Sequence, residues 1–315
     1  MKTDRFFNIF STRISKKAIF LLIGVVSFQY AMSQAQSSYW EIGLMGGISN
    51  YVGDINSMFK NGKDDSKEWN QFESSFNFYN AHFVGGVIAR YNFNPRWVLR
   101  SSLLFSKLSG DDKHFNNERN LNFRSTLQEL SLAMEFNFMD YRTGSRQHRF
   151  TPYIFGGVAL FHFNPKTEIY DPIEQETLTV SLHDLNTEGQ GLIDKRNNYS
   201  RINLSVPFGV GLKFSLSTHT CLGLEWGFRK TFTDYIDDIS TTYVDRETLL
   251  AYGGEQAVTA ADRTNELFGN EGLYHTNGEM RGNRTTKDWY NFLTISITTR
   301  LSSNSRGKCL TNNKR

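Results

Sequence analysis

Histidine is the side chain most often used for acid–base catalysis near neutral pH and for binding transition metals, so its positions are considered first. The chain has seven histidines, at positions 82, 114, 148, 162, 183, 219 and 275. Their spacing fits no metal-ligand pattern, and there is no HExxH, CxxC or P-loop motif. Gly209 and Gly211 lie within an alternating apolar pattern and do not open a helix, so they do not indicate a dinucleotide site. The sequence therefore predicts no catalytic residue, no bound metal and no cofactor.

Four aspartates form an acidic run that could bind Ca²⁺, since hard cations prefer carboxylate oxygens. They are Asp234, Asp237, Asp238 and Asp245. Their spacing matches no known calcium loop, which favours a solvated loop or a loop that pairs with basic groups. The two cysteines, Cys221 and Cys309, could form a disulfide in an oxidising compartment or remain free thiols.

Nine charged residues occupy alternate positions in segments whose other face is apolar. They are Glu41, Arg90, Arg100, Glu129, Glu135, Lys213, Glu225, Arg229 and Arg300. Apolar residues that recur at every second position indicate β-strands with two different faces. Eight such segments can be marked, at residues 40–48, 81–91, 97–106, 129–138, 153–162, 204–215, 221–229 and 289–300. We predict that each strand has a charge-free outward face, which in the fifth segment includes Tyr153, Phe155 and Phe161.

The connections between these strands alternate in length. Successive gaps are 32, 5, 22, 14, 41, 5 and 59 residues, so each odd gap is longer than its even neighbours. An up-and-down meander with short turns at one end and long loops at the other gives this alternation, whereas a Greek-key sandwich does not. Strands of about 9 to 11 residues cross a bilayer, and no stretch has the ~18 to 20 apolar residues of a spanning helix. The fold class predicted is all-β, an eight-stranded antiparallel up-and-down transmembrane β-barrel with short periplasmic turns and long extracellular loops.

An eight-stranded barrel has an interior that side chains nearly fill. The nine charged residues comprise five basic and four acidic groups, a balance suited to mutual pairing inside the lumen. A structural polar core is therefore favoured over an ion or solute pathway. Pro207 lies inside the sixth strand, where it removes a ladder hydrogen bond, so we expect a bulge, a bend or a later start of this strand.

The N-terminus has the order of a secretory signal. Five basic residues and one acidic residue lie within positions 2–17, and residues 18–28 form a mainly apolar run. Small residues then predict cleavage before Gln34 or before Gln36, with an uncleaved anchor as the alternative. Removing residues 1–33 leaves 30 basic against 31 acidic residues, so there is no electrostatic case for binding nucleic acid. The expected organisation is a signal peptide at 1–33, a barrel at 34–301 and a basic periplasmic tail at 302–315.

Both chain ends of an even-stranded barrel lie at its short-turn side, here the periplasm of a Gram-negative cell. Basic residues of one turn and of the tail are exposed there and could steer an acidic partner, although solvated turn charges are the simpler interpretation. These candidate partner-binding residues are Arg142, Arg146, Arg149, Arg306, Lys308, Lys314 and Arg315.

Four segments resemble PorG-like proteins, the outer-membrane barrels of the type IX secretion system. They are EIGLMGGISNYVGDIN (41–56), LQELSLAMEFNF (127–138), FTPYIFGGVALFHFNPKT (150–167) and RKTFTDYIDDISTTYVD (229–245). The resemblance implies a non-catalytic protein that connects a periplasmic ring of PorK- and PorN-like proteins to the outer membrane. Such machinery exports proteins with a C-terminal sorting domain and in some species supports gliding motility.

Two other functions remain open. The chain could be a stand-alone small outer-membrane barrel whose long outer loops serve adhesion, membrane stability or the passage of hydrophobic solutes. Some small barrels are instead lipid-modifying enzymes with a histidine near the rim, for which His162 is the single candidate, and an ordinary histidine at the membrane edge is the simpler interpretation.

Overall fold

A computed structural model describes residues 38–55, 80–115, 119–171, 175–193, 196–268 and 274–301. Its strands are β1 (Tyr39–Val52), β2 (His82–Asn92), β3 (Trp97–Asp111), β4 (Asn122–Asn137), β5 (Phe150–Asp171), β6 (Glu176–Ser181), β7 (Ile202–Ser215), β8 (Thr220–Thr231) and β9 (Trp289–Arg300). The expected signal peptide and the expected basic tail lie outside the described residues.

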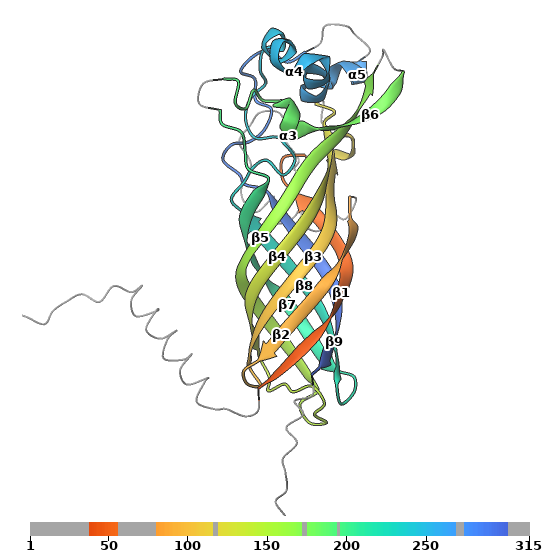
Figure 1. Cartoon of the computed structure of the whole chain (residues 1–315), viewed down its shortest axis with the longest axis vertical. Coiled ribbons are helices and arrows are strands. Elements are labelled where there is room, and N and C mark those ends of the chain that lie inside the picture. Colours follow the sequence, from red (N-terminus) through yellow and green to blue (C-terminus); the bar gives the residue numbers. More distant parts are fainter. Residues whose placement is uncertain are drawn as a thin grey trace, which may run out of the picture.

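Eight strands close into an antiparallel barrel. The order is β4-β3-β2-β1-β9-β8-β7-β5, and β5 pairs back with β4 to complete the ring (Figure 1). This confirms the predicted fold. The additional strand β6 is not part of the ring and was not predicted. It pairs only with the part of β5 that continues past the barrel wall. We call the end with the connections 93–96, 138–149 and 216–219 the turn end and the opposite end the loop end; β1 begins and β9 finishes at the turn end.

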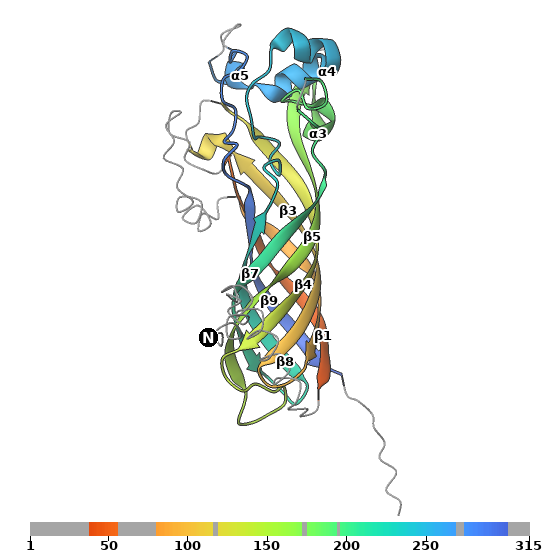
Figure 2. The same ribbon diagram turned by 90° about the vertical axis from the view of Figure 1, so that its left-hand side faces the viewer.

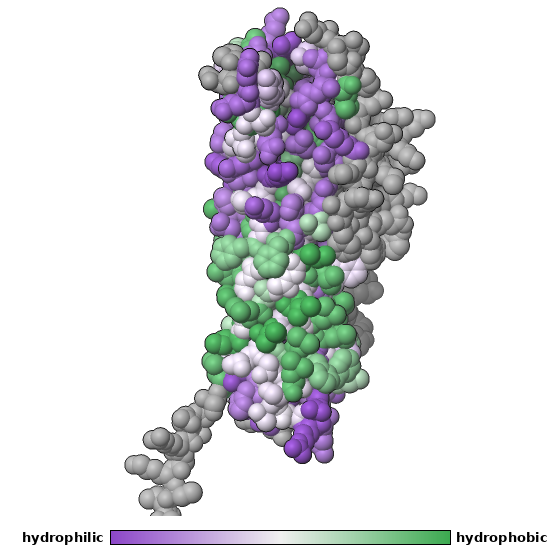
Figure 3. All heavy atoms as spheres, turned by 90° about the vertical axis from the view of Figure 1, so that its right-hand side faces the viewer, coloured by the Kyte–Doolittle hydropathy of each residue, from purple (hydrophilic) through white to green (hydrophobic). Residues whose placement is uncertain are grey.

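The outward side chains form an apolar belt around the half of the barrel nearest the turn end. Leu44 of β1, Phe83 of β2 and Val158 of β5 are 67%, 74% and 59% exposed, values that a water-soluble fold avoids over a continuous surface. Figure 3 shows this belt below a polar region that reaches the loop end. A closed ladder leaves no unpaired edge, so a barrel with such a belt is suited to cross a lipid bilayer.

The fifth strand faces the opposite way from our prediction. Tyr153, Phe155 and Phe161 are buried in the lumen, whereas Ile154, Val158 and Leu160 face outwards. Both faces of this strand are apolar, so alternation alone did not fix its orientation.

Glycines opposite β5 explain why its aromatic rings fit inside. Tyr153 pairs with Gly211 and Phe155 with Gly209 across the β5–β7 ladder. A Cβ placed on Gly211 would lie 2.4 Å from the Tyr153 ring, and a Cβ on Gly227 of β8 would lie 2.8 Å from the Phe155 ring. The missing side chains on β7 and β8 make room for the rings.

We expect Gly211→Ala to destabilise the barrel by about 1–3 kcal/mol, because the added methyl group displaces a packed ring. The matched control is Gly156→Ala on the outward face of β5, where a Cβ meets no atom within 4 Å. The urea concentration at which each variant unfolds in lipid vesicles measures the difference. Equal midpoints for the two variants would contradict this account of the lumen.

Pro207 leaves β7 intact and interrupts only one of its ladders. The strand runs through it from Ile202, so the suggestion of a later start was wrong. Pairing with β8 is continuous, Pro207 lying opposite Arg229, whereas pairing with β5 passes from Gly156↔Phe208 directly to Ala159↔Ser205. The proline therefore costs hydrogen bonds only on the side of β5.

A cap covers the loop end. It contains the 3₁₀ turn η1 (Asp112–Phe115) and the helices α3 (Leu182–Leu185), α4 (Arg246–Ala261) and α5 (Thr264–Phe268). Within the described ranges, no helix is both long and apolar enough to cross a membrane. The wall under the cap is uneven, because β3, β4 and β5 extend further than β7, β8 and β9 (Figure 2).

Candidate functional site

The lumen near the turn end contains a buried network centred on Glu135 of β4. Its carboxylate accepts a hydrogen bond from Arg90 Nε at 3.1 Å, contacts Arg100 Nη1 at 3.4 Å and pairs with Lys213 Nζ. All four side chains are almost fully buried. One carboxylate therefore holds three cations supplied by three different strands.

A second carboxylate offsets part of this excess of positive charge. Glu225 of β8 forms a two-pronged pair with Arg100, with Nη2 and Oε1 3.0 Å apart, and accepts a hydrogen bond from the Tyr153 hydroxyl at 2.8 Å. The ring of Phe155 lies 3.9 Å from the Arg100 guanidinium carbon. Charge-assisted pairs under stacked rings hold their geometry and leave little room for a moving ion.

The remaining charged residues predicted for the lumen lie in separate contacts. Arg229 Nε is 3.2 Å from Glu129, which also accepts a hydrogen bond from Tyr290 at 2.8 Å. Glu41 accepts hydrogen bonds from Thr143 and, at 3.1 Å, from Thr298. Arg300 differs from the other eight, since it is half-buried and stacks on Tyr39 at the turn end.

The connection 138–149 folds back into the turn end and closes it. Tyr141 and Thr143 are buried in the barrel mouth, where Thr143 bonds Glu41 and its own backbone nitrogen donates to the Tyr39 hydroxyl at 3.2 Å. Gly144 N donates to Ser215 Oγ at 2.8 Å. We call residues 138–149 the stopper.

The candidate partner-binding residues of the turn end lie on this stopper. Arg146 and Arg149 are exposed, and Arg142 is half-buried. Arg142 lines a cavity of about 200 Å³ together with Tyr39, Asn92 and His148. The other four candidates, Arg306, Lys308, Lys314 and Arg315, lie outside the described residues.

Apolar side chains close the loop end. Ile236 and Ile239, from the segment that follows β8, pack against Tyr51, Phe123 and Phe163 in one buried cluster. Tyr51 and Phe163 are fully buried and belong to the interior. The lumen is packed at both ends by the chain's own residues.

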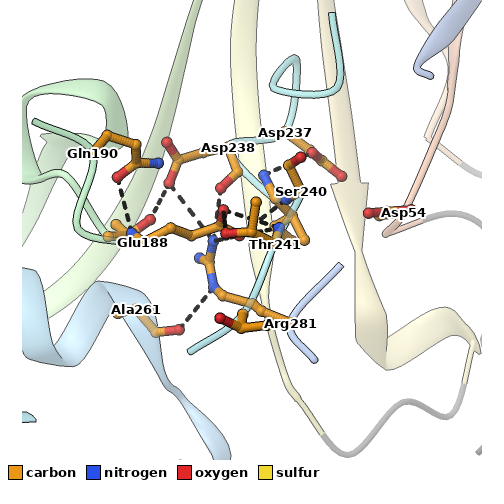
Figure 4. A network of polar contacts seen from close by, with 12 residues as sticks. Asp54, Glu188, Gln190, Asp237, Asp238, Ser240, Thr241, Ala261 and Arg281 are labelled. Atoms are coloured by element: carbon orange, nitrogen blue, oxygen red, sulfur yellow. Dashed lines mark hydrogen bonds and ion pairs between the residues drawn. The ribbon is translucent and has the colours of Figure 1, made fainter. Parts of the chain in front are cut away.

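Above this cluster, Glu188 joins three parts of the cap (Figure 4). Its carboxylate accepts hydrogen bonds from the backbone nitrogens of Ser240 at 2.9 Å and Thr241 at 3.0 Å, and pairs with Arg281 Nη1 at 3.1 Å. Arg281 also donates to the carbonyl oxygens of Asp238 at 2.7 Å and Ala261 at 3.1 Å. Glu188 and Arg281, both buried, were missed in the sequence because no strand pattern reaches into the long connections. We call this set of contacts the Glu188 clamp.

The acidic run is used for hydrogen bonds within the cap. The described residues contain no group of three or more histidine, cysteine or acidic side chains placed to hold a metal ion. Asp234 accepts from Ser240 Oγ at 2.8 Å, Asp238 bonds Thr187 and Tyr199, and Asp245 caps α4 through the backbone nitrogen of Thr248. Asp234 also lies 3.9 Å from Lys287 Nζ, and Asp238 lies 3.9 Å from Arg281 Nη1.

Several carboxyl groups at the loop end, inside and outside the acidic run, have raised pKa values. Burial raises the pKa of Asp54 and of Asp234 to about 8, and burial together with Asp237 raises the pKa of Asp288 well above its ordinary value. The Tyr51 hydroxyl lies 2.7 Å from Asp237 and 2.8 Å from Asp288. It has one hydrogen to donate, so the second contact needs a protonated carboxyl group.

We expect the cap to become less stable as the pH rises from about 4 to about 8, because the folded cap keeps protons that the unfolded chain releases. The stability contributed by these protonated carboxyl groups is complete below the ordinary aspartate pKa. It is lost as the pH rises through their raised pKa values in the folded cap. Asp288→Asn, which imitates the protonated group, should weaken this dependence, whereas the exposed Glu279→Gln should not. Hydrogen exchange of residues 234–241 at several pH values measures it, and a flat profile for the unaltered chain would contradict it.

The two other candidates for chemistry, His162 and Cys221, lie apart from each other in the barrel. His162 is on the outward face of β5, and its Nδ1 has no hydrogen-bond partner among the described residues. Cys221 is buried in the lumen near the turn end. Its proposed partner Cys309 lies outside the described residues.

The chain is similar to solved small membrane barrels. Ail, the attachment invasion locus protein of Yersinia pestis, crystallised with the heparin analogue sucrose octasulfate, is 9% identical with a TM-score of 0.34, covering 84% of this chain and 99% of Ail. OprG of Pseudomonas aeruginosa is 9% identical with a TM-score of 0.35, covering 84% and 98%. Neisserial surface protein A is 7% identical with a TM-score of 0.37, covering 84% and 100%.

No curated protein matches the chain. A family model described as a domain of unknown function, DUF6089, matches residues 16–279. This range contains all the described strands except β9. The chain therefore belongs to the DUF6089 family.

Proposed function

We propose that this protein is a non-catalytic outer-membrane barrel of a type IX protein-secretion machine, where it connects a periplasmic ring complex to the membrane. The observation that carries the proposal is the closure of the lumen at both ends, by the stopper and by the Ile236 cluster. A closed barrel acts through its rims and its outer surface and not through its interior.

The segments that resemble PorG-like proteins support the choice of machine. They cover most of β1, β4 and β5 and the chain from Arg229 to Asp245. The same segments supply Glu41, Glu129, Glu135 and Arg229 of the lumen and Ile236 and Ile239 of the loop-end cluster. The resemblance thus falls on residues that fill the lumen and on residues that close its loop end, whereas Tyr141 and Thr143 of the stopper lie outside these segments.

The proposed orientation puts the turn end in the periplasm and the cap outside the cell. The expected secretory signal would deliver the N-terminus to the periplasm. Both the first residue of β1 and the last residue of β9 lie at the turn end. The ring proteins would then meet the stopper and the chain beyond Leu301.

One observation favours the second candidate, a stand-alone barrel that binds through its cap. Large apolar side chains are exposed on the cap, and exposed apolar surface outside the membrane is common at binding sites. They are Tyr170, Leu250, Tyr252, Leu267 and Met280.

Deletion of the gene, followed by complementation with a tagged chain, separates the two candidates. We expect the deletion strain to retain sorting-domain proteins inside the cell, and chemical cross-linking to attach the tagged chain to PorK- and PorN-like ring proteins. Normal secretion together with loss of surface attachment would favour the stand-alone barrel.

Deletion of residues 302–315 should leave the barrel inserted but reduce recovery of the ring proteins several-fold, because it removes four basic residues from the proposed periplasmic side. Quantitative mass spectrometry of the cross-linked sample measures this. Unchanged recovery would exclude the tail and leave the stopper as the contact surface.

A further inference from the structure

The outward face of β3, β4 and β5 changes from apolar to basic where these strands leave the apolar belt. Residues at every second position of a strand share its outward face, so the register of the two ladders shows which outward side chains form a row across the wall. One row of the belt consists of leucines that are 38%, 54% and 48% exposed, namely Leu103, Leu130 and Leu160. The next row towards the loop end begins with Phe105 of β3, which is 51% exposed.

Three basic side chains occupy the following two rows. Lys107 of β3 lies opposite Thr126, and Arg124 of β4 lies directly opposite Lys166 of β5. All three basic side chains are exposed. Neighbouring strands are about 4.8 Å apart, so the backbones of Lys107 and Lys166, which are on strands two apart, are separated by at least about 10 Å. We call Lys107, Arg124 and Lys166 the basic patch.

The outward wall does not neutralise the basic patch. Arg124 and Lys166 are like charges placed directly opposite each other, an arrangement that destabilises a sheet. Arg124 Nη1 is 3.2 Å from a carboxylate oxygen of Glu168, but both side chains are more than half exposed, so this pair is weak. Lys107 and Lys166 have no ion pair with any described residue. The two carboxylates of this face, Glu168 and Asp111, lie one row further from the belt than Arg124, so the basic groups are nearer to the apolar surface.

The position of the basic patch fits the headgroups of lipids whose acyl chains cover the belt. A headgroup layer of about 5 to 7 Å lies on each face of the hydrocarbon. Lys107 is two residues beyond Phe105, a step of about 7 Å along a tilted strand, so its ammonium group reaches this layer. Arg124 and Lys166 lie further out, and long basic side chains can extend back along the wall towards the headgroups. The patch therefore continues the apolar belt with positive charge at the level where lipids carry phosphate.

We propose that the basic patch binds the phosphate groups of a lipid headgroup in the leaflet at the loop end, while the acyl chains of this lipid cover the neighbouring leucines of the belt. Arg124 bonds Glu168 through Nη1, which leaves Nε and Nη2 for a phosphate oxygen. Lys107 and Lys166 attract phosphate as point charges on either side. Because the patch spans three strands, a headgroup with two phosphate groups fits it better than one with a single phosphate. The proposed orientation makes this the outer leaflet, whereas the chemistry of the patch does not depend on the secretion role.

Lipid titration of the full mature chain in dodecyl maltoside, followed by native mass spectrometry, tests this proposal. The probe is lipid A with two phosphate groups, and the comparison lipid is the same lipid A without phosphate. We expect saturable binding of the phosphorylated lipid and at least about tenfold weaker binding of the lipid without phosphate. Inorganic phosphate is added in excess as a competitor, and we expect it not to displace the lipid, because it has no acyl chains to cover the belt.

Variants assign the binding to the basic patch. Lys107→Gln combined with Lys166→Gln should weaken binding about 25-fold, since each basic group near an anionic lipid surface contributes about fivefold in affinity. Replacing the same two lysines by arginine should keep most of the affinity. The matched control combines Lys230→Gln with Arg284→Gln, which removes the same charge from exposed residues of β8 and of the connection to β9, a strand on the opposite side of the ring from β4. This control should bind like the unaltered chain, and electrophoretic mobility shows that each variant is folded.

Three results would overturn the proposal. An equal loss of affinity in the two double glutamine variants would show attraction to the whole protein and not to the basic patch. Equal binding of the two forms of lipid A would show that phosphate is not recognised, and displacement by inorganic phosphate would show that the patch binds the free anion and not a lipid. None of these results bears on the ring proteins, so the secretion role is tested separately by cross-linking. Selective lipid binding without any attached ring protein would refute the secretion role and leave the lipid site in place.

Discussion

Glu135→Ala is expected to destabilise the folded barrel by about 3–5 kcal/mol, because it leaves buried cations without their shared partner. Arg90 and Lys213 lose their ion pair, and Arg100 keeps only Glu225. Water inside a packed lumen cannot replace a carboxylate. Urea unfolding in lipid vesicles, followed by the change in electrophoretic mobility between folded and unfolded barrel, measures the loss.

Two further variants show whether charge or packing causes this loss. Glu168→Ala removes a carboxylate from β5 that pairs with Arg124 in solvent, where both side chains are more than half exposed, and should cost less than about 1 kcal/mol. Glu135→Ala combined with Lys213→Met removes one of the stranded cations and should recover part of the stability. A double variant no more stable than Glu135→Ala would show that pairing is not what the carboxylate contributes.

Glu188→Ala is expected to release the cap while the barrel stays folded. Without this carboxylate, the Arg281 charge is left buried with Asp238 3.9 Å away as its nearest acidic group among the described residues, and the backbone nitrogens of Ser240 and Thr241 lose their acceptor. Breaking a buried pair of this kind costs about 3–5 kcal/mol, enough to open a locally held segment. If the cap has the proposed position outside the cell, limited proteolysis of intact cells should then cut within residues 188–245.

Glu279→Ala is the matched control, since this exposed carboxylate of the cap accepts a single side-chain hydrogen bond from the described residues, from the Thr276 hydroxyl at 2.7 Å. Its digestion pattern should equal that of the unaltered chain. The electrophoretic mobility of the folded barrel should be the same for the unaltered chain, Glu188→Ala and Glu279→Ala. If Glu188→Ala resists protease as well as the control does, the Glu188 clamp is not what holds the cap.

The strands could be predicted because the membrane requires an apolar outward face. Seven of the eight predicted strands have the expected outward face, and this requirement also put eight of the nine charged residues in the interior. The rule fails where both faces are apolar, as at Tyr153 and Phe155. Gly209, Gly211 and Gly227 carry the missing information, because they show where the interior has room for rings.

The alternation of apolar residues could not predict how the two ends of the barrel are closed. Thr143 and Glu188 act through partners more than 50 positions away in the chain, and neither belongs to a strand. Burial of a carboxylate such as Glu188 depends on Arg281 and on backbone nitrogens that only the folded cap brings together. Sequence patterns reveal elements with a local periodicity, whereas these contacts join residues that are far apart in the chain.

The uneven wall beneath the cap has a mechanical consequence. On one side of the barrel, β3, β4 and β5 continue past the belt and support the cap. On the other side, β8 and β9 end earlier and are joined to the cap by segments that are not part of the sheet. A load that pulls the cap away from the barrel would be resisted stiffly on the side of β3, β4 and β5 and would stretch the connecting segments on the side of β8 and β9. Under tension the cap should therefore tilt about the β3–β5 edge, lifting the Ile236 cluster from the barrel before any barrel strand separates.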